Sequence, residues 1–118
     1  MSENMRVTYS KSINKEKGDR VEFLLINFDY IDGIDYLARL FSEEFGFDIA
    51  ETIDGIWFRV LRIGLNGCEY ELLWHEDTGN EIYCINETDK EDILLEQRLN
   101  RILEILNYRI SERNNNQR

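Results

Sequence analysis

The sequence predicts an α+β domain in which a mostly antiparallel sheet of about five or six strands carries two helices on one face. Several segments alternate apolar and polar residues with a period of two, and two others place apolar residues at helical spacing. Gly, Asn and Asp form the turns between them, because the chain contains no proline. With 118 residues, 42% of them hydrophobic, the chain can close one core without disulfides. We therefore expect a single domain over residues 1–118 with the order ββα(β)βββα, in which residues 1–5 and 111–118 are frayed ends.

The first two predicted strands precede the first helix. Residues 7–13 alternate apolar and polar side chains, which is the pattern of a strand with one buried face. A polar turn over residues 14–19 follows. Residues 21–28 are almost wholly apolar beyond Glu22, and this composition predicts a strand that is buried on both faces.

The first predicted helix is amphipathic and has recognisable ends. Asp32 stands at the N-cap position with Asp35 in the first turn, and Gly46 stands where a left-handed residue ends a helix. Polar side chains separate its apolar residues, which recur at helical spacing: Ile34, Leu37, Ala38, Phe41 and Phe45.

The strongest local signal in the chain is Asn66-Gly67. It predicts a two-residue type I′ turn, because both turn positions need a positive φ. Such a turn fixes the register of the strands on either side of it. The register joins residues of opposite charge, and an arginine with an indole: Arg62 pairs with Glu71, and Arg59 pairs with Trp74.

Further strands extend this hairpin in both directions. Residues 49–53 form a short strand that turns at Asp54-Gly55 into the strand over residues 56–64. After the hairpin, residues 77–80 read as a four-residue loop that leads into a strand over residues 81–86. This loop places two pairs of side chains opposite each other: Trp74 with Tyr83, and Leu73 with Cys84.

The last predicted helix begins at a capping box over residues 88–91. The hydroxyl of Thr88 and the carboxylate of Glu91 are each positioned to accept from an unpaired backbone N–H. The apolar stripe behind this box predicts a helix that packs on the sheet: Leu95, Leu99, Ile102, Leu106 and Ile110.

The hairpin registers sort the side chains of the sheet onto two faces. We expect one face to form the core under the helices: Trp57, Arg59, Leu61, Ile63, Tyr70, Leu72, Trp74, Tyr83 and Ile85. The second face has an apolar centre, Phe58, Val60, Leu73 and Ile82, and also carries Arg62, Glu69, Glu71, His75 and Cys84. Two interpretations of this apolar centre remain open. Either the N-terminal hairpin or the last helix covers it, or it is an interaction surface for self-association or for a partner.

The charge of the chain predicts the kind of partner. There are 24 acidic and 14 basic residues, which gives a formal net charge of −10. A field of this sign repels nucleic acids and anionic membranes and attracts basic proteins. We expect a docking surface where acidic residues are densest, and we expect its side chains to lie close together: Glu43, Glu44, Asp48, Glu51 and Asp54.

The sequence also predicts the compartment. Residues 1–6 do not read as the start of a signal peptide, and the longest apolar runs are too short to span a membrane. Cys68 and Cys84 are too few for a disulfide scaffold and are expected to be free thiols. A cytoplasmic protein is therefore expected.

The sequence gives little support for a catalytic or metal-binding site. His75 is the only histidine, and Cys84 shares its predicted face, but two ligands do not close a metal site. Asp29, Asp32 and Asp35 lack the spacing of a calcium loop and fit helix capping better. The chain holds no nucleophile elbow, phosphate-binding glycine loop or paired cysteine motif. We expect no enzymatic activity, cofactor or metal.

In size, acidic charge and layout the chain resembles small bacterial toxin-immunity proteins that block toxin nucleases. This resemblance implies a stoichiometric inhibitor whose carboxylates occupy the nucleic-acid groove of a basic toxin. The alternative is a structural domain without catalytic function, which forms homodimers through an open sheet face.

Overall fold

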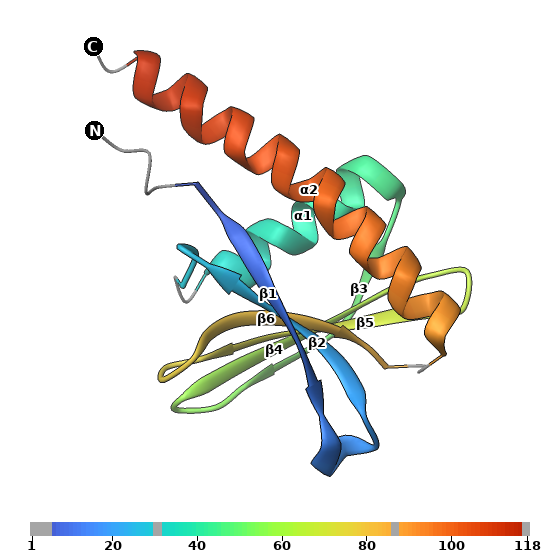
Figure 1. Cartoon of the computed structure of the whole chain (residues 1–118). Helices are drawn as coiled ribbons and strands as arrows, with labels where there is room; N and C mark the ends of the chain where they lie inside the picture. The colour runs from blue at the N-terminus through green and yellow to red at the C-terminus, as the bar shows by residue number, and fades with distance from the viewer. Residues whose placement is uncertain (1–5, 30–31, 86–87, 117–118) are drawn as a thin grey trace.

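The computed structural model describes residues 6–29, 32–85 and 88–116 (Figure 1). It confirms the α+β class: six antiparallel strands form one sheet in the order β1-β2-β6-β5-β4-β3. The elements are β1 (Thr8–Asn14), a short 3-10 helix (Lys15–Lys17), β2 (Arg20–Ile26), α1 (Gly33–Phe45), β3 (Asp48–Asp54), β4 (Phe58–Leu65), β5 (Cys68–His75), β6 (Gly79–Cys84) and α2 (Asp89–Asn116).

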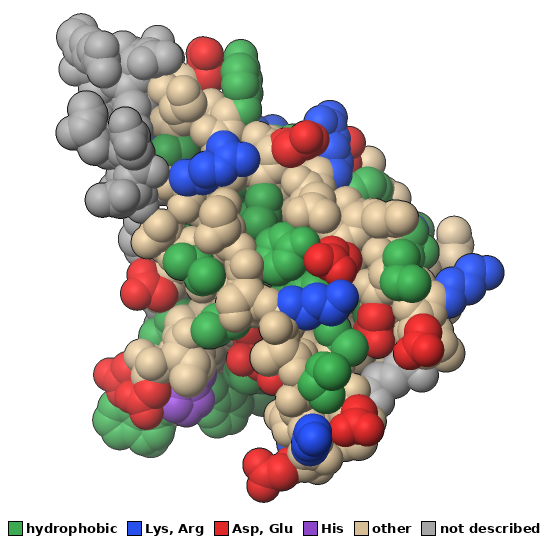
Figure 2. All heavy atoms as spheres, viewed as in Figure 1, with side chains coloured by type: hydrophobic (Ala, Val, Ile, Leu, Met, Phe, Trp, Pro, Cys, Tyr) green, Lys and Arg blue, Asp and Glu red, His purple; other side chains and the backbone are tan. Residues whose placement is uncertain are grey.

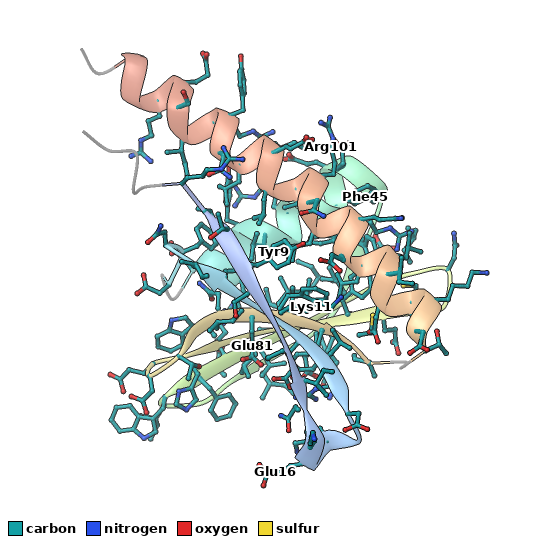
Figure 3. All side chains as sticks on the ribbon, viewed as in Figure 1. Tyr9, Lys11, Glu16, Phe45, Glu81 and Arg101 are labelled. Atoms are coloured by element: carbon teal, nitrogen blue, oxygen red, sulfur yellow. The ribbon has the colours of Figure 1, made fainter. Side chains whose placement is uncertain are left out.

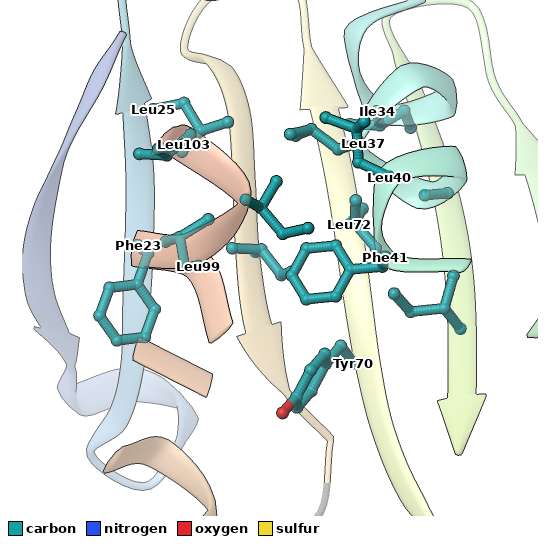
Figure 4. Close-up of a cluster of buried hydrophobic side chains, with 14 of the residues drawn as sticks. Phe23, Leu25, Ile34, Leu37, Leu40, Phe41, Tyr70, Leu72, Leu99 and Leu103 are labelled. Carbon is teal, nitrogen blue, oxygen red and sulfur yellow. The ribbon is translucent and has the colours of Figure 1, made fainter. Parts of the chain in front are cut away.

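Both helices pack on the same face of the sheet (Figure 1). Helix α1 lies over β4 and β5, and α2 lies over the half of the sheet that contains β6. Apolar side chains of the two helices meet those of the sheet in one buried cluster, part of which Figure 4 shows: Phe23, Leu25, Ile34, Leu37, Leu40, Phe41, Tyr70, Leu72, Leu99 and Leu103. The core therefore lies on one side of the sheet, between it and the helices.

The predicted β4–β5 hairpin is confirmed. Asn66 has a φ of 51° and Gly67 a φ of 84°, as a type I′ turn requires. The register pairs Arg62 with Glu71 and Arg59 with Trp74. The side chains of residues 58–65 and 68–75 therefore share faces as predicted.

The predicted register of β6 is wrong. The β5–β6 loop has three residues, because His75 pairs with Gly79, and Gly79 takes the left-handed conformation with a φ of 83°. Trp74 consequently pairs with Asn80 rather than with Tyr83. A register shift of an odd number of residues exchanges the two faces of a strand. Ile82 and Cys84 therefore lie in the core, whereas Tyr83 faces away from the helices and the neighbouring Ile85 is 37% exposed.

The helix ends differ in detail from the prediction. Gly46 ends α1 with a φ of 88°, as predicted, but the Asp32 side chain makes no capping hydrogen bond. Thr88 caps α2, since the N–H of Glu91 donates to its hydroxyl over 3.1 Å. Helix α2 continues to Asn116, so the prediction of a frayed end is wrong for residues 111–116. Residues 117–118 lie outside the described residues. Residues 111–116 contain no Gly or Pro that would stop a helix.

Strand β2 is buried on one face rather than on both. Phe23 and Leu25 point into the core, whereas Ile26 on the opposite face is 42% exposed. None of the helices in the described ranges is both long and apolar enough to cross a membrane.

Candidate protein-binding surface

The face of the sheet opposite the helices, here called the open face, carries an apolar row across the strands. Leu24 of β2, Leu73 of β5, Val60 of β4 and Ile53 of β3 occupy neighbouring register positions. Glu81 of β6 lies between Leu24 and Leu73 in the same row. Among the described residues, both helices pack on the other face, so the N-terminal hairpin and the last helix do not cover this row.

A charged row runs beside the apolar row. The guanidinium of Arg20 lies 3.6 Å from the centre of the Tyr83 ring, and the Tyr83 hydroxyl donates to Glu71. Arg62 on β4 links its two neighbouring strands, since it donates to Glu71 of β5 over 2.9 Å and to Glu51 of β3 over 3.1 Å. These contacts link the side chains of this row from β2 across to β3.

Glu81 differs from the other carboxylates of the open face. It is half-buried between apolar neighbours, and among the described residues it has no ion-pair partner within 4.0 Å. Burial raises the pKa of Glu81, and the negative charge of Glu22 raises it further, while the positive charge of Arg20 acts in the opposite direction. A carboxylate in this position gains energy from any cation that reaches it.

A second apolar feature, here called the hairpin tip, consists of Ile56, Trp57 and Phe58 at the turn between β3 and β4. These side chains are 84%, 58% and 37% exposed, respectively. The predicted place of Trp57 in the core is therefore wrong, because Trp57 precedes β4 and belongs to the turn. Phe58 pairs with His75 on the open face, so the hairpin tip adjoins that face.

The predicted apolar centre is confirmed for three of its four residues. Phe58, Val60 and Leu73 lie on the open face, and Val60 is 9% exposed because its neighbours cover it. Ile82 is fully buried under the helices and does not belong to this surface.

The five predicted docking carboxylates are all exposed, but they do not share one surface. On the helix side of the molecule, Glu43 pairs with Arg109 over 3.5 Å, and Glu44 pairs with Arg101 over 3.0 Å. The other three lie on β3, where the pleat and a bulge divide them between the two faces. Asp48 and Glu51 share the open face, and Asp54 lies on the helix side, where it pairs with Arg59.

The two cysteines and the histidine lie in different environments. Cys84 is buried and Cys68 half-buried on the helix side, and burial raises the pKa of both thiols, so they stay protonated near neutral pH. His75 is on the other face, where its Nδ1 accepts from the N–H of Asp77 over 3.0 Å. In the part of the chain that the structure describes, no three His, Cys, Asp or Glu side chains are grouped to hold a metal ion.

Two open depressions lie between the start of β1 and the C-terminal half of α2. Their volumes are about 630 and 390 Å³, and Arg6, Glu104 and Asn107 line both of them. They are on the helix side of the molecule, and their lining mixes polar and apolar side chains. Neither contributes to the open face.

No protein-family model matches the chain, and neither does any curated protein or any solved structure. Sequence reasoning missed Glu81, because its predicted register was wrong, and it missed the hairpin tip. The hairpin tip could have been predicted from Gly55-Ile56-Trp57, because two large apolar residues directly follow a turn residue there.

Proposed function

We propose that this protein is a non-catalytic binding domain that docks a basic protein on the open face of its sheet. The observation that carries the proposal is a sheet face not covered by the helices, on which an apolar row adjoins a row of paired charges. Interfaces between proteins combine apolar centres with polar rims in this way. The apolar row alone would serve equally for self-association, so the charge of the face decides between partners.

The charge of the open face is negative. The register places six carboxylates on it, Glu22, Asp48, Glu51, Glu69, Glu71 and Glu81, and two guanidiniums, Arg20 and Arg62, a difference of four negative charges. The whole chain has a net charge of −10, so distant charges act in the same direction. A basic surface is steered toward such a face, whereas a second copy of the chain is repelled.

Glu81 is the proposed receptor for a lysine or arginine of the partner. Its neighbours Leu24 and Leu73 offer apolar contact to the methylene stem of such a side chain, while its carboxylate pairs with the charged end. Pairing with a cation compensates the half-buried carboxylate for the hydration that it has partly lost in the fold. The contact therefore stabilises the complex at the centre of the interface.

A toxin nuclease is the class of basic partner that the resemblance to immunity proteins favours. The protein would then act as a stoichiometric inhibitor in the cytoplasm, where it would cover the nucleic-acid groove of the toxin with its carboxylates. A homodimer formed through the open face is the alternative.

The test begins with affinity capture from native lysate and identification of the bound protein by mass spectrometry. The purified partner is then measured by surface plasmon resonance over a salt series from about 0.05 to 0.5 M, because screening acts over this range. We expect a partner with a basic isoelectric point and an association rate that falls as salt rises. An acidic partner, or a rate that does not depend on salt, would contradict the proposal.

Variants locate the binding face. Leu73→Lys changes the apolar row, and Ile93→Lys is its matched control, because Ile93 is exposed on α2, on the other side of the molecule. We expect Leu73→Lys to weaken binding at least about tenfold, as loss of a central contact does, and Ile93→Lys to bind like the wild type. Sedimentation tests the alternative: a wild-type dimer that Leu73→Lys converts to a monomer would replace the proposal with self-association.

A further inference from the structure

We propose that the hairpin tip is the apolar anchor of the interface and inserts into an apolar pocket of the basic partner. This inference rests on the proposed function and adds the residues that carry the binding energy and the shape of the partner's site. It concerns Ile56 and Trp57, which project from the turn, and Phe58, which joins them to the open face.

Ile56 and Trp57 contribute little packing energy to the fold, because most of their surface is exposed. Ile56 is 84% exposed and Trp57 is 58% exposed, although both are large apolar side chains. Aromatic side chains are enriched at the centres of protein interfaces, because they bury a large area and lose little conformational entropy. A tryptophan beside an isoleucine at a turn is therefore suited to fill a pocket on another molecule.

The backbone holds the hairpin tip in one arrangement. The N–H of Gly55 donates to the carbonyl of Phe58 over 2.9 Å, and the N–H of Glu76 donates to the carbonyl of Trp57 over 2.9 Å. The Phe58 ring lies directly against Gly55, where a Cβ atom would clash with it. These contacts tie the turn to the neighbouring β5–β6 loop, so an anchor here loses little freedom on binding.

Carboxylates surround the hairpin tip. Asp54 precedes it in the chain, and the exposed Glu76 and Asp77 lie in the β5–β6 loop that is bonded to it. Arg59, the nearby cation, is already shared between Asp35, over 2.9 Å, and Asp54. Figures 2 and 3 show hydrophobic side chains and carboxylates together where these two turns meet at the end of the sheet. The matching site is therefore an apolar pocket with basic side chains at its rim.

This acidic surround distinguishes a protein partner from the other occupants of an exposed aromatic turn. Membrane surfaces carry negative charge and repel carboxylates placed beside an inserting side chain. In a symmetric dimer through the hairpin tip, the same patch meets itself, so the carboxylates of the two copies would face each other. A basic protein is the occupant that the charge complements.

Photo-crosslinking tests the position of the anchor. Trp57→p-benzoylphenylalanine and Tyr108→p-benzoylphenylalanine place the same probe at two exposed sites, since Tyr108 is 66% exposed on α2. We expect the probe at position 57 to form a discrete adduct with a basic protein in native lysate and the probe at position 108 to form none. Equal labelling from both positions, or no adduct at position 57, would overturn the inference.

The partner identified by crosslinking is then purified, and its affinity for each variant measures how much binding energy the anchor contributes. Trp57→Ala is expected to weaken the affinity for this partner about thirtyfold, as loss of an interface hot spot does. The matched control Tyr108→Ala removes an equally exposed aromatic side chain and is expected to leave affinity unchanged. Both variants should melt like the wild type, because neither side chain is buried. An affinity that Trp57→Ala does not change would overturn the inference.

Three further results separate the possible failures. A blue shift of tryptophan fluorescence with phosphatidylcholine vesicles that Trp57→Ala abolishes would assign the tip to a membrane. A dimer that dissociates on Trp57→Ala would assign it to self-association. Binding of a basic partner that Leu73→Lys abolishes and Trp57→Ala does not would leave the proposed function in place and remove only the anchor.

Discussion

Three residues at two hairpin turns, Asn66, Gly67 and Gly79, decide which side chains of β5 and β6 reach the open face. All three have a positive φ, which sets the length of each loop and hence the register of the strands. The 66–67 turn brings Leu73 to the open face beside Val60. Gly79 completes the β5–β6 loop and brings Glu81, rather than Ile82, beside Leu73.

Substitution at Gly67 tests the first of these turns. Gly67 has a φ of 84°, and a Cβ atom there has open space, so only backbone strain opposes a side chain. We expect Gly67→Ala to cost about 1–2 kcal/mol of unfolding free energy, and Gly67→Val to cost more because it is β-branched. Urea denaturation measures both. Gly64→Ala is the control, since its Cβ would meet ordinary contacts at 3.7 Å. Equal effects at Gly64 and Gly67 would contradict the turn assignment.

Glu81→Gln tests the half-buried carboxylate through pH. The folded state raises the pKa of Glu81 above its ordinary value of 4.5, so the charged form destabilises the folded state at neutral pH. Removing the charge should therefore raise the melting temperature at pH 7, and the difference from wild type should vanish as pH falls below 4.5. The control is Glu16→Gln, in the exposed 3-10 helix before β2. The same Glu81→Gln variant should bind the partner more weakly. A variant that is less stable at pH 7 would disprove the assignment.

At the scale of elements, helix α2 holds the edge strand β1 in place. Asn107 makes two hydrogen bonds to the backbone of Val7: its Oδ1 accepts from the N–H over 2.8 Å, and its Nδ2 donates to the carbonyl over 2.9 Å. Tyr9 donates to Glu96 over 2.6 Å, about three turns earlier along the helix. These contacts span the sequence from one end to the other and fix the long last helix on the sheet.

Asn107→Leu is the test of this attachment. The change leaves the N–H and carbonyl of Val7 without their side-chain partners, which costs about 1–3 kcal/mol. We expect faster hydrogen exchange at the Val7 amide and a lower melting temperature. Tyr108→Ala, at the exposed neighbouring position, is expected to change neither. Unaltered exchange at Val7 in Asn107→Leu would show that other contacts hold β1.

Strand register could be predicted from the sequence where the turn residues are compatible with only one turn type. Asn66-Gly67 fits one hairpin type, and the register of Phe58, Val60 and Leu73 followed from it. Residues 77–80 all favour turns, so their types could not distinguish a loop of three residues from one of four. That ambiguity moved Ile82 to the wrong face. Trp57 was misplaced because alternation does not reveal where a strand begins.

At the scale of the whole molecule, the net charge of −10 is distributed over both sides, so position decides which carboxylates steer a partner. Asp48→Lys and Glu43→Lys make the same change in net charge, one on the open face and one on the helix side. We expect Asp48→Lys to slow association more than Glu43→Lys, with small effects on dissociation, because exposed charges act mainly on encounter. Surface plasmon resonance at low salt measures both rates. A larger effect at Glu43 would favour the helix side.

A footprint of the complex distinguishes docking of a basic protein on the open face and hairpin tip from docking elsewhere on the molecule. Amide signals of ¹⁵N-labelled protein are followed while the captured, unlabelled partner is added. We expect shifts and broadening at the outward positions of β4, β5 and β6 and at residues 55–58, with the α2 signals near Tyr108 unchanged. A footprint confined to the helices, with the signals of Trp57, Leu73 and Glu81 unchanged, would contradict it.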